Sequence, residues 1–122
     1  MKVEWDFGER MLSLFLDGEL DHHAAKNIMR EIGELVDDKL PLRCSLDLGG
    51  VSFMDSSGIA VVLRLYRRIY EIGGALRVMN VQPQSYKVLS AAGVEKIVPL
   101  YPVGAKEALG EIFAYAAGGE TT

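Results

Sequence analysis

The sequence predicts a single α/β domain built around a mixed, mostly parallel β-sheet with an N-terminal strand pair and about four packed α-helices. Its hydrophobic residues switch repeatedly between a spacing of two, typical of strands, and about three and a half, typical of helices. Alternating strands and helices favour parallel pairing through right-handed crossovers. The 122 residues, 49% of them hydrophobic, suit one packed core. We assign residues 1–116 to the domain and residues 117–122 to a flexible C-terminal tail.

Two neighbouring strands are expected at the N-terminus, on either side of a turn at Gly8-Glu9. Apolar residues alternate there with other residues, at Val3, Trp5, Phe7, Leu12, Leu14 and Leu16. A helix follows from Asp21, which stands where an N-cap belongs, to Asp38. Its apolar residues recur at helical spacing, at Ala25, Ile28, Ile32, Leu35 and Val36. Pro41 ends this helix because proline cannot continue the hydrogen-bond ladder.

The second half of the chain repeats the alternation of strand and helix. A short buried strand is expected over 44–48, ending at Gly49-Gly50. Residues 57–72 form the clearest amphipathic helix, and Gly73-Gly74 ends it. The remaining elements are expected in this order: a strand over 76–79, a helix over 83–92, a strand over 97–100 and an alanine-rich helix over 103–116.

The composition argues against several classes of function. The chain carries 13 Lys and Arg against 17 Asp and Glu, and its net charge of -4 gives no reason to expect a nucleic-acid partner. Its one cysteine, Cys44, cannot form an intrachain disulfide and has the spacing of a core residue. With no recognisable leader and no apolar run of about 18 residues, we expect a cytoplasmic protein without a membrane segment. No glycine-rich phosphate loop indicates a cofactor.

The segment from Val51 to Ile59 is the leading candidate for a functional site, because it joins a strand to the long second helix. Two adjacent serines, Ser56 and Ser57, lie at the expected start of that helix. In the simplest interpretation, Asp55 or Ser56 only caps the helix. In the second interpretation, Ser57 accepts a phosphate, which free backbone amides and the positive end of the helix dipole accommodate.

A phosphate on this serine would add about -1.5 to -2 charges at one point of the surface. The nearest carboxylate is expected to be that of Asp55, with Asp47 and Asp21 as further candidates. A partner that covers this point would meet both added bulk and charge repulsion. Phosphorylation would therefore switch binding off without unfolding the helix.

Three motifs occur in an order that is typical of one known family. They are the segments Gly18-Glu19-Leu20-Asp21-His22-His23, Ser52-Phe53-Met54-Asp55-Ser56-Ser57-Gly58-Ile59 and Ile72-Gly73-Gly74. With these motifs the chain resembles the STAS domain proteins, and among them the bacterial anti-sigma factor antagonists of the sporulation type. The resemblance extends from about Trp5 to Ala114 and implies a STAS-like fold.

In that family the second serine of the Asp-Ser-Ser-Gly motif is phosphorylated, and this position corresponds to Ser57. The resemblance implies that the anti-sigma factor is itself the serine kinase, and that the unphosphorylated antagonist binds it and releases the sigma factor. A separate serine phosphatase resets the switch. The chain departs from the pattern at Ala60, where a second glycine is common, whereas His22-His23 matches the sporulation type.

The expected docking surface for this partner comprises Asp21, His22, Met54, Asp55, Ser56, Ser57, Gly58, Ile59 and Arg64. Met54 is expected in a loop just before the serines, where it offers an adaptable apolar contact. Arg64 lies two helical turns beyond Ser57, about 10 Å away on the same side, so it can meet acidic residues of a partner.

Other functions remain as alternatives. Ser57, Asp55 and the two histidines include the ingredients of a hydrolytic triad, but no Gly-x-Ser-x-Gly elbow accompanies them, and we expect no enzyme activity. His22 and His23 would point about 100° apart on a helix, which argues against a shared metal ion. The main alternative is a STAS scaffold or small-ligand-sensing subunit. It would form a large homo-assembly, whereas the switch protein would be monomeric alone.

Overall fold

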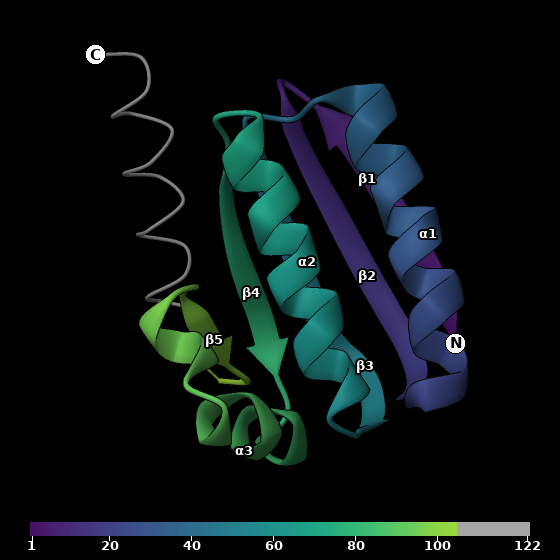
Figure 1. Ribbon diagram of the computed structural model, residues 1–122, viewed down its shortest axis with the longest axis vertical. Coiled ribbons are helices and arrows are strands. Elements are labelled where there is room, and N and C mark those ends of the chain that lie inside the picture. Colours follow the sequence, from purple (N-terminus) through teal and green to yellow (C-terminus); the bar gives the residue numbers. More distant parts are fainter. Residues whose placement is uncertain (105–122) are drawn as a thin grey trace.

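A computed structural model describes residues 1–104, and this part of the chain forms five strands and three α-helices (Figure 1). The elements in chain order are β1 (Lys2–Gly8), β2 (Met11–Leu20), α1 (His22–Lys39), β3 (Arg43–Met54), α2 (Ser57–Glu71), β4 (Ala75–Val81), α3 (Pro83–Ala91), the 3-10 helix η1 (Val94–Lys96) and β5 (Leu100–Pro102). The predicted α/β class and the predicted N-terminal strand pair are confirmed.

The strands form one sheet in the order β1-β2-β3-β4-β5. β1 is antiparallel to β2, and the other neighbouring pairs are parallel, so the sheet is mixed and mostly parallel as predicted. Helices α1 and α2 lie side by side over one face of the sheet, and α3 lies at the end toward which the parallel strands run (Figure 1). The carboxyl ends of β2 and β3 therefore meet the first turns of α1 and α2.

The hydrophobic core lies between the sheet and the helices α1 and α2. Side chains alternate between the two faces of a strand, so every second residue of the central strands points into this core. The largest fully buried side chains include Leu12, Leu14, Leu16, Leu46, Leu48 and Ile69. Cys44 belongs to the core, as predicted, and burial raises the pKa of its thiol to about 12.

β3 is longer than the sequence predicted. The predicted strand ends at Gly49-Gly50, but β3 continues through both glycines to Met54. The extended strand remains paired with β2, and the register between the two strands shifts twice, between Phe15 and Asp17 and between Gly18 and Glu19. At Gly50 the two backbones approach so closely that a Cβ atom would lie 2.8 Å from the Leu16 carbonyl oxygen, and only glycine fits there. The residues expected to form a loop before the serines therefore belong largely to the sheet.

The strand predicted over 97–100 is also displaced. The amides of Ile97 and Val98 both donate to the Val94 carbonyl oxygen, each at 2.9 Å, and these bonds hold the segment in a turn after η1. Pairing with β4 therefore begins only at Leu100, the first residue of β5.

The number of helices differs from the prediction within the described part of the chain, which holds three α-helices rather than about four. The fourth predicted helix, over 103–116, and the predicted tail, over 117–122, lie outside the described residues, except that Val103 and Gly104 lie in a turn. None of the helices within residues 1–104 has the length and hydrophobicity that a bilayer-spanning helix needs.

Candidate functional site

The candidate site lies where β2 and β3 end and α1 and α2 begin (Figure 1). β2 and β3 are parallel neighbours, and their last residues, Leu20 and Met54, are partners in the ladder. This register brings the start of α1 beside the start of α2. Functional residues of α/β sheets commonly lie at this edge, because the loops that follow the strands can vary without disturbing the core.

Asp55 connects the two helix starts. One of its carboxylate oxygens accepts a hydrogen bond from the Ser57 amide at 2.8 Å, and the other accepts one from the His22 amide at 3.0 Å. The Asp55 amide donates to the Leu20 carbonyl oxygen at 3.3 Å. Asp55 therefore caps α2, as the simplest interpretation of the sequence predicted, whereas Ser56 makes no side-chain capping bond.

The first-turn amides of α2 already have partners within the chain. Besides the Ser57 amide, the Gly58 amide donates to the Asp55 carbonyl oxygen at 3.0 Å, and the Ile59 amide donates to the Ser56 carbonyl oxygen at 3.1 Å. The expectation that free amides would hold a phosphate on Ser57 is therefore wrong, because the capping turn uses them. The helix dipole still favours an anion at this point.

The Asp55 carboxyl is held in its charged form. The hydrogen bond from the Ser57 amide is the main cause that lowers the pKa of Asp55 below its usual range. Desolvation opposes this shift, and the bond from the His22 amide adds to it. Because the pKa is lowered in the folded state, Asp55 stabilises the fold above its unfolded-state pKa, and this contribution is lost as the pH falls through the folded-state value.

Asp55→Asn is expected to remove this pH-dependent contribution, because asparagine offers one acceptor oxygen to two amides. Denaturant unfolding at a series of pH values is expected to show a loss of stability that is largest above about pH 4 and shrinks at lower pH. Asp6→Asn makes the same change at an exposed position of β1 and serves as the matched control, and it is expected to change the stability little at neutral pH. An equal loss for Asp55→Asn at every pH would contradict the role assigned to this carboxylate.

Met54 does not reach the surface. Its side chain is fully buried and lies against Gly58, where an added Cβ atom would come 2.6 Å from the Met54 Sδ. The prediction that Met54 offers a partner contact from a loop is therefore wrong, because this residue ends β3 and packs under the start of α2. Gly58 is buried as well, and its missing side chain permits this close packing.

Gln84 was not singled out from the sequence, although it helps to hold the site. Its side-chain oxygen accepts a hydrogen bond from the Met54 amide at 2.8 Å, and its side-chain nitrogen donates to the Met54 carbonyl at 2.7 Å. β4 pairs with β3 only as far as Asp47, so no strand lies beside Met54 on that side. The Gln84 side chain of α3 makes the backbone hydrogen bonds that a neighbouring strand would otherwise make. The two residues are 30 positions apart, and no local pattern could have indicated the contact.

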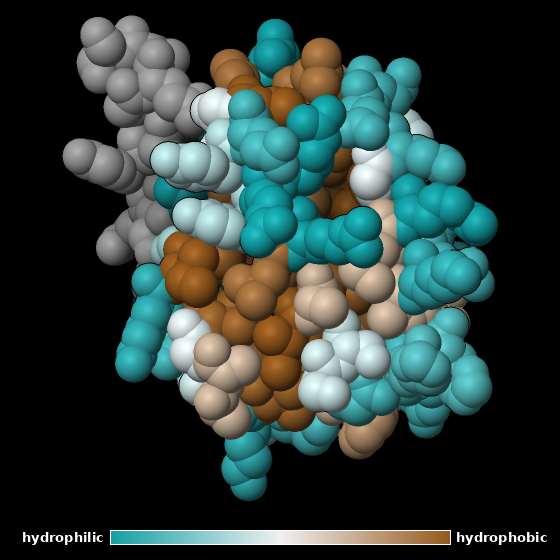
Figure 2. All heavy atoms as spheres, viewed as in Figure 1, coloured by the Kyte–Doolittle hydropathy of each residue, from teal (hydrophilic) through white to brown (hydrophobic). Residues whose placement is uncertain are grey.

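The surface around Ser57 combines hydroxyl groups with apolar side chains. Ser56 is exposed, and Ser57 is half-buried at the first position of α2. Phe53 is 43% exposed, because successive residues of β3 point to opposite faces and Met54 points inward. Figure 2 shows hydrophobic residues at the surface over the lower part of α2 and beside α3. Phe53 was missed as a candidate contact, although its alternation with Met54 could have indicated it.

The segment before α1 completes this edge of the molecule. Asp21 caps α1, as predicted, by accepting a hydrogen bond from the Ala24 amide at 3.0 Å. His22 and His23 are exposed, and their ring centroids lie 5.5 Å apart in an edge-to-face arrangement. Over residues 1–104, no group of three or more His, Cys, Asp or Glu side chains could hold a metal ion.

Two residues considered in the sequence lie farther from Ser57. Arg64 is exposed on α2, and its guanidinium contacts the Met29 sulfur of α1 at 3.8 Å. Asp47, a candidate neighbour of the phosphate, instead accepts a hydrogen bond from the Asn80 side chain at 2.8 Å. It lies in the middle of β3, roughly 20 Å before Met54 along the strand. The structure therefore brings His22 and Asp55 to Ser57, with Asp21 next to His22 in the chain, but it does not bring Asp47 there.

The chain is similar over most of its length to proteins of known function. The family model described as STAS domain matches residues 3–106. An anti-sigma F factor antagonist of Paenibacillus polymyxa is 33% identical over 101 residues, which cover 83% of this chain and 86% of that protein. An anti-sigma F factor antagonist of Lysinibacillus sphaericus is 35% identical over 79 residues, which cover 65% of this chain and 68% of that protein.

Solved structures show the same similarity. The Bacillus cell fate determinant SpoIIAA in its phosphorylated form has 25% sequence identity and a TM-score of 0.68, and the match covers 91% of this chain and 99% of that one. The anti-sigma factor antagonist SpoIIAA in its unphosphorylated form has 25% identity and a TM-score of 0.65, with 91% and 97% coverage. An anti-sigma factor antagonist of Mycobacterium paratuberculosis, at 23% identity, shares the fold with a TM-score of 0.76 over 89% of this chain and 92% of that one.

Proposed function

The chain belongs to the STAS domain family, and from this premise we propose that it is an anti-sigma factor antagonist whose binding is switched by phosphorylation of Ser57. In its unphosphorylated form it binds an anti-sigma factor and thereby releases a sigma factor. A phosphate on Ser57 ends this binding. The proposal is supported by the relatives named as anti-sigma F factor antagonists and by the likeness to SpoIIAA, which has been solved in both forms.

The observation that carries the proposal is the position of Ser57. It is the first residue of α2 and is half-buried rather than sealed in the core, so a kinase can reach its hydroxyl. Its amide is bonded to Asp55, and the next two amides of the helix are also occupied. An added phosphate therefore finds no free amide of the first turn to bind, and in this proposal it meets the docked partner instead.

The charge beside Ser57 supports the direction of the switch. Asp55 carries a negative charge near neutral pH, as aspartates ordinarily do, and its lowered pKa extends this charged range to lower pH. A phosphate adds about -1.5 to -2 further charges next to it. A partner that covers the exposed Phe53 and the half-buried Ile59 would have to desolvate these charges at the same time. Burying uncompensated charge is costly, so the phosphorylated form dissociates.

The proposed partners are an anti-sigma factor with serine kinase activity, which both binds the chain and modifies it, and a serine phosphatase. The exchange takes place in the cytoplasm, and the chain contributes binding rather than catalysis. The proposed docking surface comprises Asp21, His22, Asp55, Ser56, Ser57, Ile59 and Arg64, with Phe53 added. Gly58, which was expected on this surface, is buried, and it packs with Met54 beneath the surface. A native mass equal to one chain would fit this role, whereas a large homo-assembly would favour a STAS scaffold.

The direct test is phosphorylation of the chain by its anti-sigma factor in the presence of ATP. The parent is expected to gain the mass of one phosphoryl group, located by peptide mapping on Ser57. Ser57→Ala is expected to gain none and to bind the anti-sigma factor as tightly as the unmodified parent. Ser56→Ala is the matched control and is expected to be phosphorylated like the parent. A parent that takes no phosphate, or a Ser57→Ala variant that still takes one, would refute the assignment.

A further inference from the structure

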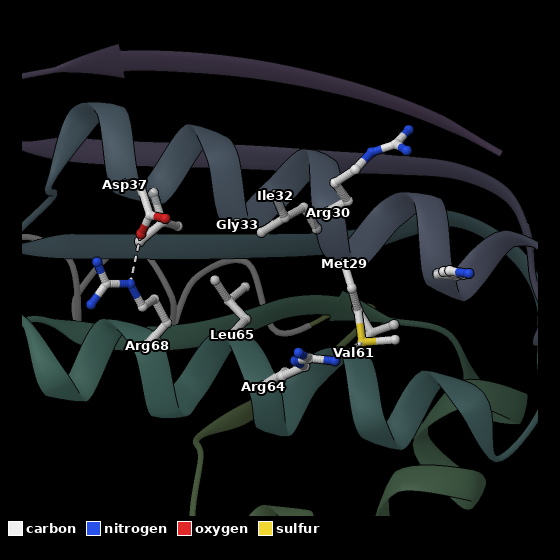
Figure 3. Close-up of a pocket in the computed structure, with 11 residues that line it drawn as sticks. Met29, Arg30, Ile32, Gly33, Asp37, Val61, Arg64, Leu65 and Arg68 are labelled. Atoms are coloured by element: carbon white, nitrogen blue, oxygen red, sulfur yellow. Dashed lines mark hydrogen bonds and ion pairs between the residues drawn. The ribbon is translucent and has the colours of Figure 1, made fainter.

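A groove of about 430 Å³ lies between α1 and α2 on the helix-covered side of the molecule (Figure 3). Its floor consists of buried core side chains, Ile32 and Val36 from α1 and Val61 and Leu65 from α2. Gly33 lines the α1 side, and a Cβ atom added there would meet nothing within 4 Å. Open space therefore lies above an apolar floor, and its volume is in the range of small-molecule sites.

The rim of this groove is positively charged. Lys26, Arg64 and Arg68 line it together with one carboxylate, that of Asp37. Arg30 also lines it, although its guanidinium points away from α2 (Figure 3). The whole chain carries a net charge of -4, so this rim is a local concentration of positive charge on an acidic protein. A cleft lined by charges of one sign attracts ligands of the opposite sign.

Two contacts cross the groove between the helices (Figure 3). The Arg68 Nε donates to the Asp37 carboxylate at 2.7 Å, which forms an ion pair. The Arg64 guanidinium instead contacts the Met29 sulfur at 3.8 Å, and a thioether sulfur is a weak acceptor. Within the part of the chain that the structure describes, no carboxylate pairs with Arg64. Its donors are therefore available to an anion.

We propose that this groove binds a small amphiphilic anion, specifically an aliphatic carboxylate of medium chain length. The hydrocarbon chain lies over the floor at Val61 and Leu65 and fills the space beside Gly33. Because these floor side chains are already buried, the apolar surface removed from water is chiefly that of the hydrocarbon chain. The carboxylate replaces the Met29 sulfur as the acceptor for Arg64, because charge-assisted hydrogen bonds from arginine to a carboxylate are strong. The site is two helical turns from Ser57, and binding there does not require the switch.

The test uses the full chain and decanoate below its micelle-forming concentration, followed by amide chemical shifts and titration calorimetry. Saturable binding of one decanoate per chain is expected, with shifts concentrated at the groove. Gly33→Leu fills the open space, and it is expected to lower the affinity at least about tenfold without lowering the melting temperature, since leucine favours helix more than glycine. Arg64→Gln is expected to lower the affinity about tenfold, the loss typical of one charge-assisted hydrogen bond.

Two controls separate this site from general attraction to the surface. Arg67→Gln removes the same charge from an exposed position of α2 outside the groove and is expected to bind decanoate as the parent does. Decyltrimethylammonium has the same apolar chain with a cationic head and is expected not to bind. Absence of saturation, equal binding to Gly33→Leu, or equal binding of the cation would overturn the proposal. If the amide chemical shifts of the groove residues changed only when an anti-sigma factor was added, the groove would belong to a protein partner, and the carboxylate proposal would be overturned as well.

Discussion

Ser57→Asp is expected to weaken binding of the anti-sigma factor by about 100-fold, because a like charge placed inside an interface costs several kcal/mol. The new carboxylate stands beside the charged Asp55 at the start of α2. The fold itself should remain intact, since a negative charge in the first turn interacts favourably with the helix dipole. Titration calorimetry gives the affinity, and the melting temperature verifies the fold.

Ser57→Asn separates the effect of charge from that of size, because asparagine has nearly the volume of aspartate without its charge. It is expected to lose much less affinity than Ser57→Asp. If Ser57→Asp bound as the parent does, charge at this position would not control docking and the proposed switch would fail. If both variants lost affinity equally, bulk alone would account for the effect, and the electrostatic part of the mechanism would be wrong.

Gly58→Ala is expected to destabilise the protein by about 1–3 kcal/mol, the usual cost of adding a methylene to a well-packed core. The added Cβ would lie 2.6 Å from the Sδ and 3.0 Å from the Cε of Met54, whose side chain has no exposed surface. The methionine must therefore move, and it carries the end of β3 and the start of α2 with it. Denaturant unfolding measures the loss directly.

Gly33→Ala is the matched control, because it makes the same change inside a helix where the new Cβ meets nothing within 4 Å. It is expected to stabilise the protein by up to about 1 kcal/mol, the difference in helix propensity between the two residues. Combining Gly58→Ala with Met54→Ala should cost less than the sum of the single changes. The shortened residue 54 no longer collides with the new Cβ, and the new methyl group fills part of the cavity that Met54 leaves. Strict additivity would mean that the two side chains do not collide.

The sequence predicted most of the elements correctly because their signals are local. The period of two in β1 and β2 and the helical spacing in α1 and α2 are each visible within a window of a few residues. The errors occur where a long-range contact decides the local structure. The extension of β3 past Gly50 depends on its pairing with β2, and the late start of β5 depends on bonds to Val94.

The candidate site was predicted in part for the same reason. Ser57 stands at the start of α2, and Asp21 and Asp55 cap the two helices as their residue types indicate. Burial of Met54 was missed because the loop in which it was expected is sheet. Gln84 could not be found at all, since its partner is 30 residues away and its sequence context is that of an ordinary first helical turn.

The sequence by itself determined the α/β class, the order of the first seven elements and the serine that begins the second long helix, because these follow from residue spacing and capping preferences over short distances. Only the tertiary structure decided which groups surround that serine and which backbone amides near it are already hydrogen-bonded. The carboxylate of Asp55 ties Ser57 to His22, which is 33 positions from Asp55, and it occupies the amide that a phosphate would otherwise use. The groove between α1 and α2 likewise exists only after packing, since no local pattern places Gly33 and Arg64 in the same groove.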